Sequence, residues 1–191
     1  MHKIFFDIET SNTFQEVGSR DPSALDLSLI AIYDSQKDDY FSFLQNELGN
    51  LWPILEGADI LIGFYSDKFD IPLLNKYYPG DLTKLRSLDI LAEIKKSLGR
   101  NVGLDKLAQG TLGTKKSGHG LQATNWWKQG KVEEVRKYCI QDVKVTKGIY
   151  DYAMENQKLK FMEDGEVVEF AIDTSNWEKK DPNSVTHTLP F

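Results

Sequence analysis

The 191-residue chain contains one cysteine, three histidines and no long apolar run. The single cysteine, Cys139, excludes an internal disulfide and any metal site built from several cysteines. No stretch approaches the roughly 18 consecutive apolar residues that a membrane-spanning helix requires. The amino terminus also lacks the longer apolar core of a secretory signal peptide. These absences predict a soluble cytoplasmic protein that does not associate with a membrane.

The composition is that of an ordinary globular domain. Hydrophobic residues make up 40% of the chain and charged residues 27%. The chain can therefore bury a core and need not be disordered, and its length suits one α/β domain.

The net charge of −6 is unevenly distributed. Residues 1–67 contain 3 Lys/Arg and 12 Asp/Glu, whereas residues 68–147 contain 16 and 8. Residues 148–191 contain 4 and 9. A polyanion responds to the local field, so the central basic block permits a nucleic-acid partner despite the overall charge. The alternative is that these lysines only solvate helix surfaces.

Hydrophobic periodicity predicts strands first, followed by alternating strands and helices. Strands are expected at residues 2–8, 28–34, 39–44 and 59–64, with a terminal hairpin at 158–162 and 166–172. Helices are expected at residues 46–57, 70–78, 89–98, 104–112, 122–129 and 132–156. In the first of these, Pro53 is expected to mark a second start or a kink. This order predicts an α/β fold with a mixed β-sheet flanked by helices, and a polar, loosely ordered end after the hairpin.

Three groups of residues could carry chemistry, although each also has a structural explanation. Asp7 and Glu9 are two apart on the first strand, so both carboxylates project from one face, where a cation would relieve their repulsion. Tyr138 and Asp142 are one turn apart on the long helix. Asp70 follows an apolar strand, where it could be a metal ligand or could cap the helix that begins there.

Taken together, these groups resemble the three motifs of the DEDD superfamily of 3′–5′ exonucleases, which have a ribonuclease H-like fold. The motifs read FDIET at Phe6–Thr10, GFYSDKFDIPLL at Gly63–Leu74 and YCIQDVKVT at Tyr138–Thr146. The resemblance runs from about residue 2 to residue 155. It is nearest to bacterial exonuclease domains that occur alone or attached to helicases. It implies an exonuclease domain over residues 1–157, with the hairpin and tail of residues 158–191 in the same domain.

The third motif indicates which branch of the superfamily the chain resembles. Tyr138 precedes Asp142 by four residues, as in the tyrosine (DEDDy) branch, whereas the histidine branch would have a histidine where this chain has Lys137. One position departs from the pattern. Many relatives have asparagine two residues after the glycine of the second motif, where this chain has Tyr65. This departure puts in doubt how the second motif contacts the terminal nucleotide.

The resemblance also implies a site with two divalent ions, about 3.5–4 Å apart. Asp7 would bridge them, Glu9 and Asp142 would complete the site of the attacking water, and Asp70 would support the second ion. Oxygen ligands favour Mg²⁺ or Mn²⁺ over Zn²⁺. A free phenol has a pKa of about 10 and is a poor base at neutral pH, so Tyr138 is expected to position the water.

The expected substrate is nucleic acid with a single-stranded 3′ end, and a helicase or polymerase is a candidate partner. Substrate contacts are expected from Thr10, Tyr65 and Lys68. The candidate phosphate contacts of the basic block are Lys68, Lys76, Lys115, Lys116, Lys128 and Lys131. Trp126 and Trp127 could stack on bases, but adjacent helix positions cannot both face the strand, so at least one is expected in the core.

Other functions stay open at this point. An endonuclease of the ribonuclease H or resolvase type would share the fold and the acidic site. A non-catalytic module would bind strand ends only, although the complete acid set argues against one. A nucleotide-binding α/β protein is disfavoured, because no glycine-rich loop follows the first strand.

Overall fold

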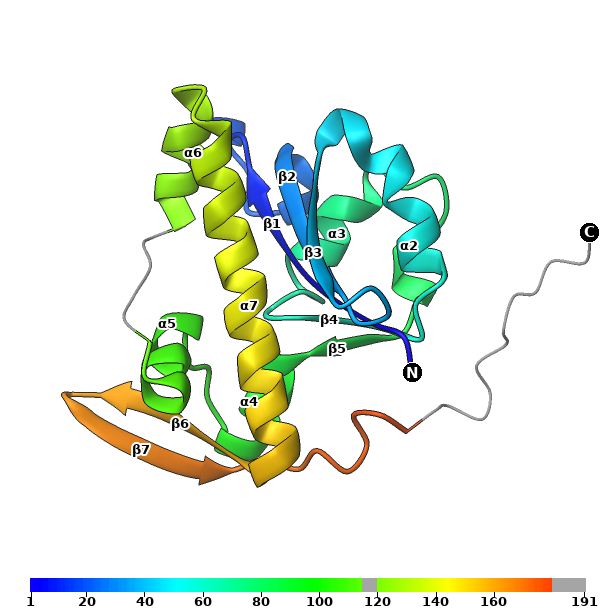
Figure 1. Ribbon diagram of the computed structural model, residues 1–191. Coiled ribbons are helices and arrows are strands. Elements are labelled where there is room, and N and C mark those ends of the chain that lie inside the picture. Colours follow the sequence, from blue (N-terminus) through cyan, green and yellow to red (C-terminus); the bar gives the residue numbers. More distant parts are fainter. Residues whose placement is uncertain (115–119, 180–191) are drawn as a thin grey trace, which may run out of the picture.

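The computed structural model describes residues 1–114 and 120–179. A single mixed sheet lies at the centre, with the strand order β3-β2-β1-β4-β5 (Figure 1). The strands of this sheet are β1 (Lys3–Thr10), β2 (Leu27–Asp34), β3 (Asp39–Leu44), β4 (Ile60–Gly63) and β5 (Ser87–Asp89). Strands β1, β2 and β3 pair antiparallel, whereas β4 and β5 continue the sheet in parallel with β1. Strand β1 is therefore central, with neighbours on both edges.

Helices cover both faces of the sheet. The α-helices are α1 (Phe14–Val17), α2 (Trp52–Glu56), α3 (Asp70–Asn75), α4 (Ile90–Leu98), α5 (Leu104–Leu107), α6 (Gly120–Lys128) and α7 (Val132–Asn156). Figure 1 shows α7 running across one face, with α2 and α3 on the other. Across the described ranges, no helix is long and apolar enough to cross a membrane.

The core is accordingly divided into two clusters by the sheet. One cluster, on the α7 side, contains Phe5, Leu29 and Val143. The other, on the α2 and α3 side, contains Phe6 and Ile30. Successive residues of β1 and β2 thus alternate between the clusters, as the period of a strand requires. Both faces of the central strands are apolar because both are covered.

A two-stranded hairpin follows α7. It consists of β6 (Lys158–Glu163) and β7 (Glu166–Ala171), paired antiparallel. A Cβ atom at Gly110 would lie 2.5 Å from the backbone of Phe161, so a glycine there lets the hairpin approach the preceding helical segment closely. The central sheet, its helices and this hairpin confirm the predicted fold class.

Most predicted elements are present, and several differ in their bounds or type. The predicted helix at residues 46–57 is divided into a 3₁₀ segment, η2 (Gln45–Asn50), and α2, and Pro53, the expected second start or kink, lies in the first turn of α2. The predicted helix at residues 104–112 continues from α5 as a π-helix, η4 (Ala108–Leu112). Strand β5 was not expected: the prediction placed Asp89 in a helix, but it is the residue before α4.

Several short elements were not predicted either. They are α1 and two 3₁₀ turns, η1 (Pro22–Ala24) and η3 (Leu82–Lys84). Helix α3 ends three residues before the predicted end at residue 78. The predicted loosely ordered end lies mainly outside the described residues.

Candidate active site

Strand β1 presents Asp7 and Glu9 on the face that α7 covers. Phe5, two residues earlier, lies in the core cluster on that side, so the two acids follow it along the same face. Asp7 is paired with Ala31 across the antiparallel strand β2, and this small neighbour leaves room for a carboxylate. Glu9 is only 8% exposed and Asp7 is partly buried, so the pair does not lie on a fully exposed strand end.

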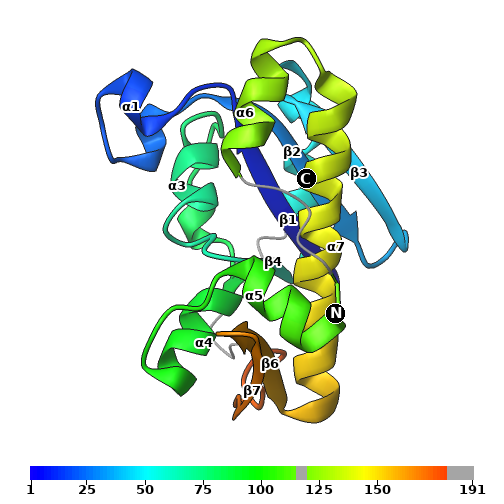
Figure 2. The same cartoon turned by 90° about the vertical axis from the view of Figure 1, so that its left-hand side faces the viewer.

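Helix α7 brings the second group to the same place. Tyr138 and Asp142 are one helical turn apart, and α7 packs directly on β1. Figure 2 shows β1 in the centre, with α1 and α3 on one side and α6 and α7 on the other. The ring of Trp126, on α6, meets the ring of Tyr138 edge to face, with centroids 6.1 Å apart. Tyr138 is thereby held between α6 and the acids of β1.

The loop after β4 delivers the third group. Asp70 is the first residue of α3 and is 4% exposed. Its carboxylate accepts a hydrogen bond of 3.2 Å from the backbone N–H of Ile8, on β1. The helix-cap alternative is wrong, because Phe69 is the capping residue and makes no side-chain cap. Asp70 is thus tied to the strand between Asp7 and Glu9.

The geometry of the same loop accounts for two residues of the second motif, Gly63 and Tyr65. A Cβ atom at Gly63 would lie 2.5 Å from the Cβ atom of Ser66, so only glycine allows this tight turn. Tyr65 has φ = 64°, a left-handed conformation that asparagine adopts more readily than tyrosine. Asp89 holds this conformation, since it accepts hydrogen bonds from the N–H groups of Tyr65 (2.9 Å) and Asp67 (3.3 Å).

These elements enclose a pocket of about 370 Å³. It is lined by Asp7, Ile8, Glu9, Thr10, Asn12, Thr13, Phe14, Leu25, Phe64, Tyr65, Phe69, Asp70, Leu121, Thr124, Tyr138 and Asp142. The structure therefore brings together all four predicted acids, Tyr138 and the predicted substrate contacts Thr10 and Tyr65. Lys68 is exposed and lies outside this lining.

The acids of this pocket, which we call the acid cluster (Asp7, Glu9, Asp70 and Asp142), hold protons unusually strongly. Burial and the neighbouring carboxylates raise the pKa of Asp7 well above its ordinary value, and the pKa of Glu9 for the same reasons. Burial raises the pKa of Asp70 to about 7, and burial with the charge of Asp105 raises that of Asp142 to about 7. No Lys, Arg or His is among the described residues that line the pocket.

Tyr138 is affected in the same direction. Burial, followed by the charges of Asp142, Glu9 and Asp7, raises the pKa of its hydroxyl above the ordinary value of a phenol. The hydroxyl therefore stays protonated at neutral pH. It can donate a hydrogen bond to a water or a phosphate oxygen, but it is not a free base.

Cys139 is a contributor that the sequence did not reveal. The buried thiol lies 3.2 Å from the carbonyl oxygen of Asp7 and 3.5 Å from its Oδ2 atom. Burial raises its pKa, so the thiol is protonated and donates to Asp7. Its position next to Tyr138 in the third motif was the only available signal, because contact with β1 depends on the packing of α7.

The donor set fits a hard divalent cation. Ligand atoms of Asp7, Glu9 and Cys139 lie within 4.8 Å of one another. Since the thiol is protonated, carboxylate oxygens are the available ligands, and these suit Mg²⁺ or Mn²⁺. Glu9 and Asp70 are buried, Asp7 and Asp142 are partly buried, and no cation from the described residues lines the pocket, so the four carboxyl groups are costly to ionise together. A bound cation would remove that cost.

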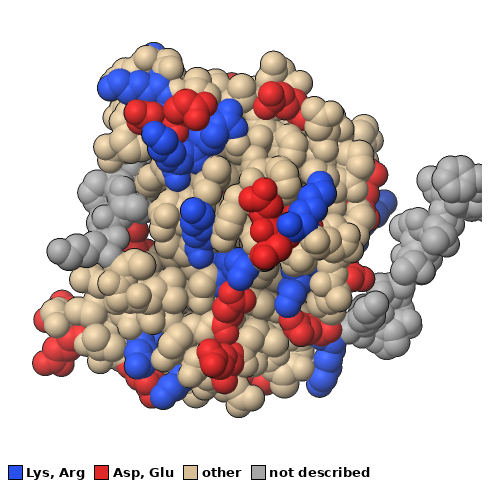
Figure 3. All heavy atoms as spheres, in the orientation of Figure 1, with Lys and Arg blue, Asp and Glu red and all other residues tan. Residues whose placement is uncertain are grey.

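The basic block is less available than its composition suggested. At least seven of its 16 Lys and Arg residues form ion pairs within the described part of the chain: Lys76, Lys84, Lys96, Arg100, Lys128, Arg136 and Lys147. On the face shown in Figure 3, basic and acidic side chains are interspersed. The candidates Lys76 and Lys128 pair with acids of the first 67 residues, whereas Lys115 and Lys116 lie outside the described residues.

Trp126 and Trp127 are both half-buried and pack against the core cluster on the α7 side. The expectation of at least one core tryptophan therefore agrees with their packing. Trp126 supports Tyr138 and is not positioned as an open stacking platform.

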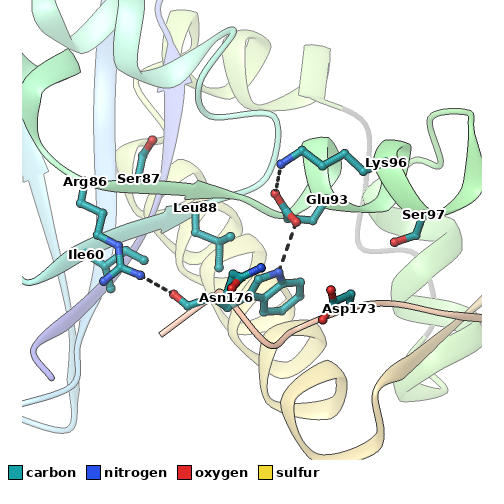
Figure 4. Close-up of a pocket in the computed structure, with 10 residues that line it drawn as sticks. Ile60, Arg86, Ser87, Leu88, Glu93, Lys96, Ser97, Asp173 and Asn176 are labelled. Atoms are coloured by element: carbon teal, nitrogen blue, oxygen red, sulfur yellow. Dashed lines mark hydrogen bonds and ion pairs between the residues drawn. The ribbon is translucent and has the colours of Figure 1, made fainter. Parts of the chain in front are cut away.

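A second hollow, of about 490 Å³, lies between β5, α4 and residues 173–177 (Figure 4). Its charged groups are matched with partners. Glu93 accepts hydrogen bonds from Lys96 (2.5 Å) and from Nε1 of Trp177 (3.4 Å). Arg86 donates to the carbonyl oxygen of Trp177 at 2.8 Å. This hollow, although larger, contains none of the predicted site residues.

The comparisons with known proteins concern the family and the fold of the chain. A family model described as 3′-5′ exonuclease matches residues 2–157, which is most of the chain. Among solved structures, the chain is similar to the family B DNA polymerase from the hyperthermophilic archaeon Pyrobaculum calidifontis, with a TM-score of 0.61 and 17% identity. The similarity covers 81% of this chain and 24% of the polymerase, and it supports the ribonuclease H-like fold. No similar sequence was found among curated proteins.

Proposed function

This chain belongs to the 3′-5′ exonuclease family, and from that premise we propose that it is an active, metal-dependent nuclease of the tyrosine (DEDDy) branch. It would hydrolyse phosphodiester bonds at the 3′ end of DNA or RNA. The observation that carries this proposal is the convergence of the acid cluster and Tyr138 in one pocket that no described cation neutralises.

The acid cluster would hold two ions of Mg²⁺ or Mn²⁺. When bound, such ions acidify the attacking water and stabilise the negative charge that develops on the leaving oxygen. The protein supplies the rest. Glu9 and Asp70 are fixed by burial, and the hydrogen bond from Ile8 keeps Asp70 beside β1. Asp7 is held by the thiol of Cys139. A site fixed in this way needs little rearrangement during the reaction.

Tyr138 would position the attacking water. Its raised pKa keeps the proton on the hydroxyl, so the phenol acts as a hydrogen-bond donor. Trp126 restricts the ring by its edge-to-face contact, and Asp142 lies one helical turn farther along α7. The geometry favours orientation of the water over removal of its proton.

The rim of the pocket supports nucleic acid as the substrate. Five large hydrophobic side chains are exposed among the described residues, and three of them line this pocket: Phe14 (37%), Tyr65 (46%) and Leu121 (68%). Phe69 packs edge to face on Phe14, with ring centroids 6.0 Å apart. Apolar and aromatic groups beside an acidic centre suit an unstacked base and sugar, with the phosphate at the acids.

A single-stranded 3′ end fits this pocket best, because its terminal base is free to leave the stack. Thr10 and Tyr65 are proposed to contact the terminal nucleotide, and Lys68 a phosphate farther along the strand. We also propose that the hairpin and the C-terminal residues form one domain with residues 1–157. A helicase or polymerase partner that delivers strand ends remains part of the proposal.

The test uses single- and double-stranded DNA and RNA, each labelled at the 5′ end and, in a second set, blocked at the 3′ end. Stepwise shortening from the 3′ end with Mn²⁺ or Mg²⁺, abolished by EDTA and by Asp7→Asn, is expected. Internal cuts in the blocked substrates would indicate the endonuclease alternative. Binding of strand ends without metal-stimulated turnover would indicate the non-catalytic one.

A further inference from the structure

One ion pair joins two elements that are far apart in the sequence. Nζ of Lys128, at the end of α6, donates a hydrogen bond to Oε1 of Glu16, on α1. The two residues are 112 positions apart, and both side chains are partly exposed. Because no local pattern requires this contact, it results from the way in which α1 and α6 approach each other.

These two elements border the acid-lined pocket. Thr13 and Phe14 contribute to its lining from the α1 side, and Leu121 and Thr124 contribute from α6. The contact between Glu16 and Lys128 therefore connects two elements that border the pocket, at positions just outside its lining. Figure 2 shows that α1 and α6 lie at the same end of the molecule, beyond the end of β1 that carries the acids.

Glu16 is held firmly on its own side. Its Oε2 atom accepts hydrogen bonds from the backbone N–H (2.8 Å) and the hydroxyl (3.1 Å) of Thr13, which completes a capping box at the start of α1. The hydrogen bonds from Lys128 and Thr13 keep the pKa of Glu16 below its ordinary value, so it is ionised at neutral pH. The bridge thus has a fixed anionic end and a flexible cationic end.

We propose that the bridge between Glu16 and Lys128 closes the gap between α1 and α6 to a continuing strand, and so makes the enzyme require a strand end. This inference rests on the proposed function. A strand that ended at the acid cluster would not have to cross the gap. A strand that continued would have to separate the two side chains and move its next phosphates past the carboxylate of Glu16.

The experiment compares circular and linear single-stranded DNA of the same sequence, with Mn²⁺, and measures the ratio of internal to terminal cleavage. Glu16→Gln should raise this ratio most, about three- to ten-fold, because it removes the repelling carboxylate and leaves Lys128 free to attract a phosphate. Lys128→Met should raise it less, since the gap opens but Glu16 remains. The double variant with the charges exchanged, Glu16→Lys with Lys128→Glu, should have a lower ratio than Glu16→Gln.

Asp151→Asn is the matched control, because it breaks a similar ion pair, with Lys147 on α7, away from the pocket lining. Its ratio should equal that of the wild type. An unchanged ratio in both Glu16→Gln and Lys128→Met would overturn the inference, as would an equal rise in Asp151→Asn. Lys128→Met leaves the capping box intact, so it tests the bridge even where Glu16→Gln weakens α1. Failure of the wild type to shorten linear DNA would instead contradict the proposed function.

Discussion

Two hollows in the described part of the chain both contain carboxylates, but in opposite electrostatic states. In the larger one, between β5, α4 and residues 173–177, Glu93 is paired with Lys96. The pKa of Asp173 there is lowered by hydrogen bonds from Ser175. In the smaller one, every member of the acid cluster has a raised pKa. By volume alone, the larger hollow would be the candidate active site. The raised pKa values of the acid cluster indicate the smaller one instead.

The difference shows how each arrangement of charges affects the free energy of folding. Paired charges at a partly exposed site contribute little to stability and need no ligand. Buried carboxylates without a cation oppose one another, so folding holds them together at a cost in free energy. Such a cost is expected where a ligand or a reaction compensates for it. Changes in the two hollows should therefore have opposite consequences.

The largest contrast should come from removing one charge of the acid cluster. Asp7→Asn is expected to lower exonuclease activity by about 10³-fold, because several kcal/mol of transition-state stabilisation depend on bound cations. The same variant should unfold at a higher temperature without metal, since one of the repelling carboxylates is gone. Asp173→Asn is the matched change in the larger hollow, and its activity should stay within about two-fold of the wild type. Equal losses in both variants would contradict the comparison.

The acid cluster should destabilise the metal-free protein in a pH-dependent way, and a bound metal ion should reverse this loss of stability. Asp70 and Asp142 have folded pKa values of about 7, above their ordinary value of 3.8, so the folded state binds more protons than the unfolded state. The metal-free protein should therefore lose stability as the pH rises from about 4 to about 7.

A divalent ion should restore this loss. At a concentration of 100 times its dissociation constant it adds about 2.7 kcal/mol. Thermal unfolding with and without Mg²⁺ or Mn²⁺ measures both effects, and the stabilisation should be larger at pH 8 than at pH 5. A pH-independent stabilisation would show that the ion binds elsewhere.

The sequence predicted the acid cluster well because its chemistry restricts residue types and its spacings are local. Asp7 and Glu9 share a face by the period of a strand, and Tyr138 and Asp142 by the turn of a helix. The resemblance of the three motifs to the exonuclease superfamily then predicted that these residues meet in one site. The alternation of strands and helices was sufficient for the fold class.

What the sequence did not predict depends on contacts between distant segments. Strand β5 has three residues, too few for a periodic pattern, and it was absorbed into the next helix. The contact of Cys139 with Asp7 requires α7 to lie on β1. The basic block looked available because its partners, such as Glu16 for Lys128 and Asp26 for Lys76, lie far away in the sequence.

Tyr138→Phe separates positioning from metal binding within the acid-lined pocket. The variant keeps the ring and its packing on Trp126 but loses the hydroxyl donor. Turnover should fall by roughly 10- to 100-fold, at the lower end of effects seen for groups that assist proton transfer. Calorimetric affinity for Mn²⁺ should change little, because the hydroxyl is not among the carboxylate ligands. Full activity of Tyr138→Phe would show that the water is oriented without it.

The smallest effect should come from the larger hollow, where Arg86 is joined to the backbone of residue 177. Arg86→Met removes a hydrogen bond of 2.8 Å to the carbonyl oxygen of Trp177 but keeps the length of the side chain. Since the group is half-buried, the free energy of unfolding should fall by about 1 kcal/mol. Denaturant unfolding measures this loss, and exonuclease activity, assayed on the same preparation below its unfolding transition, should stay within about two-fold. A loss of activity comparable to that of Tyr138→Phe would mean that the larger hollow also takes part in the reaction. The pairing of charges in the larger hollow would then not distinguish a structural site from a catalytic one.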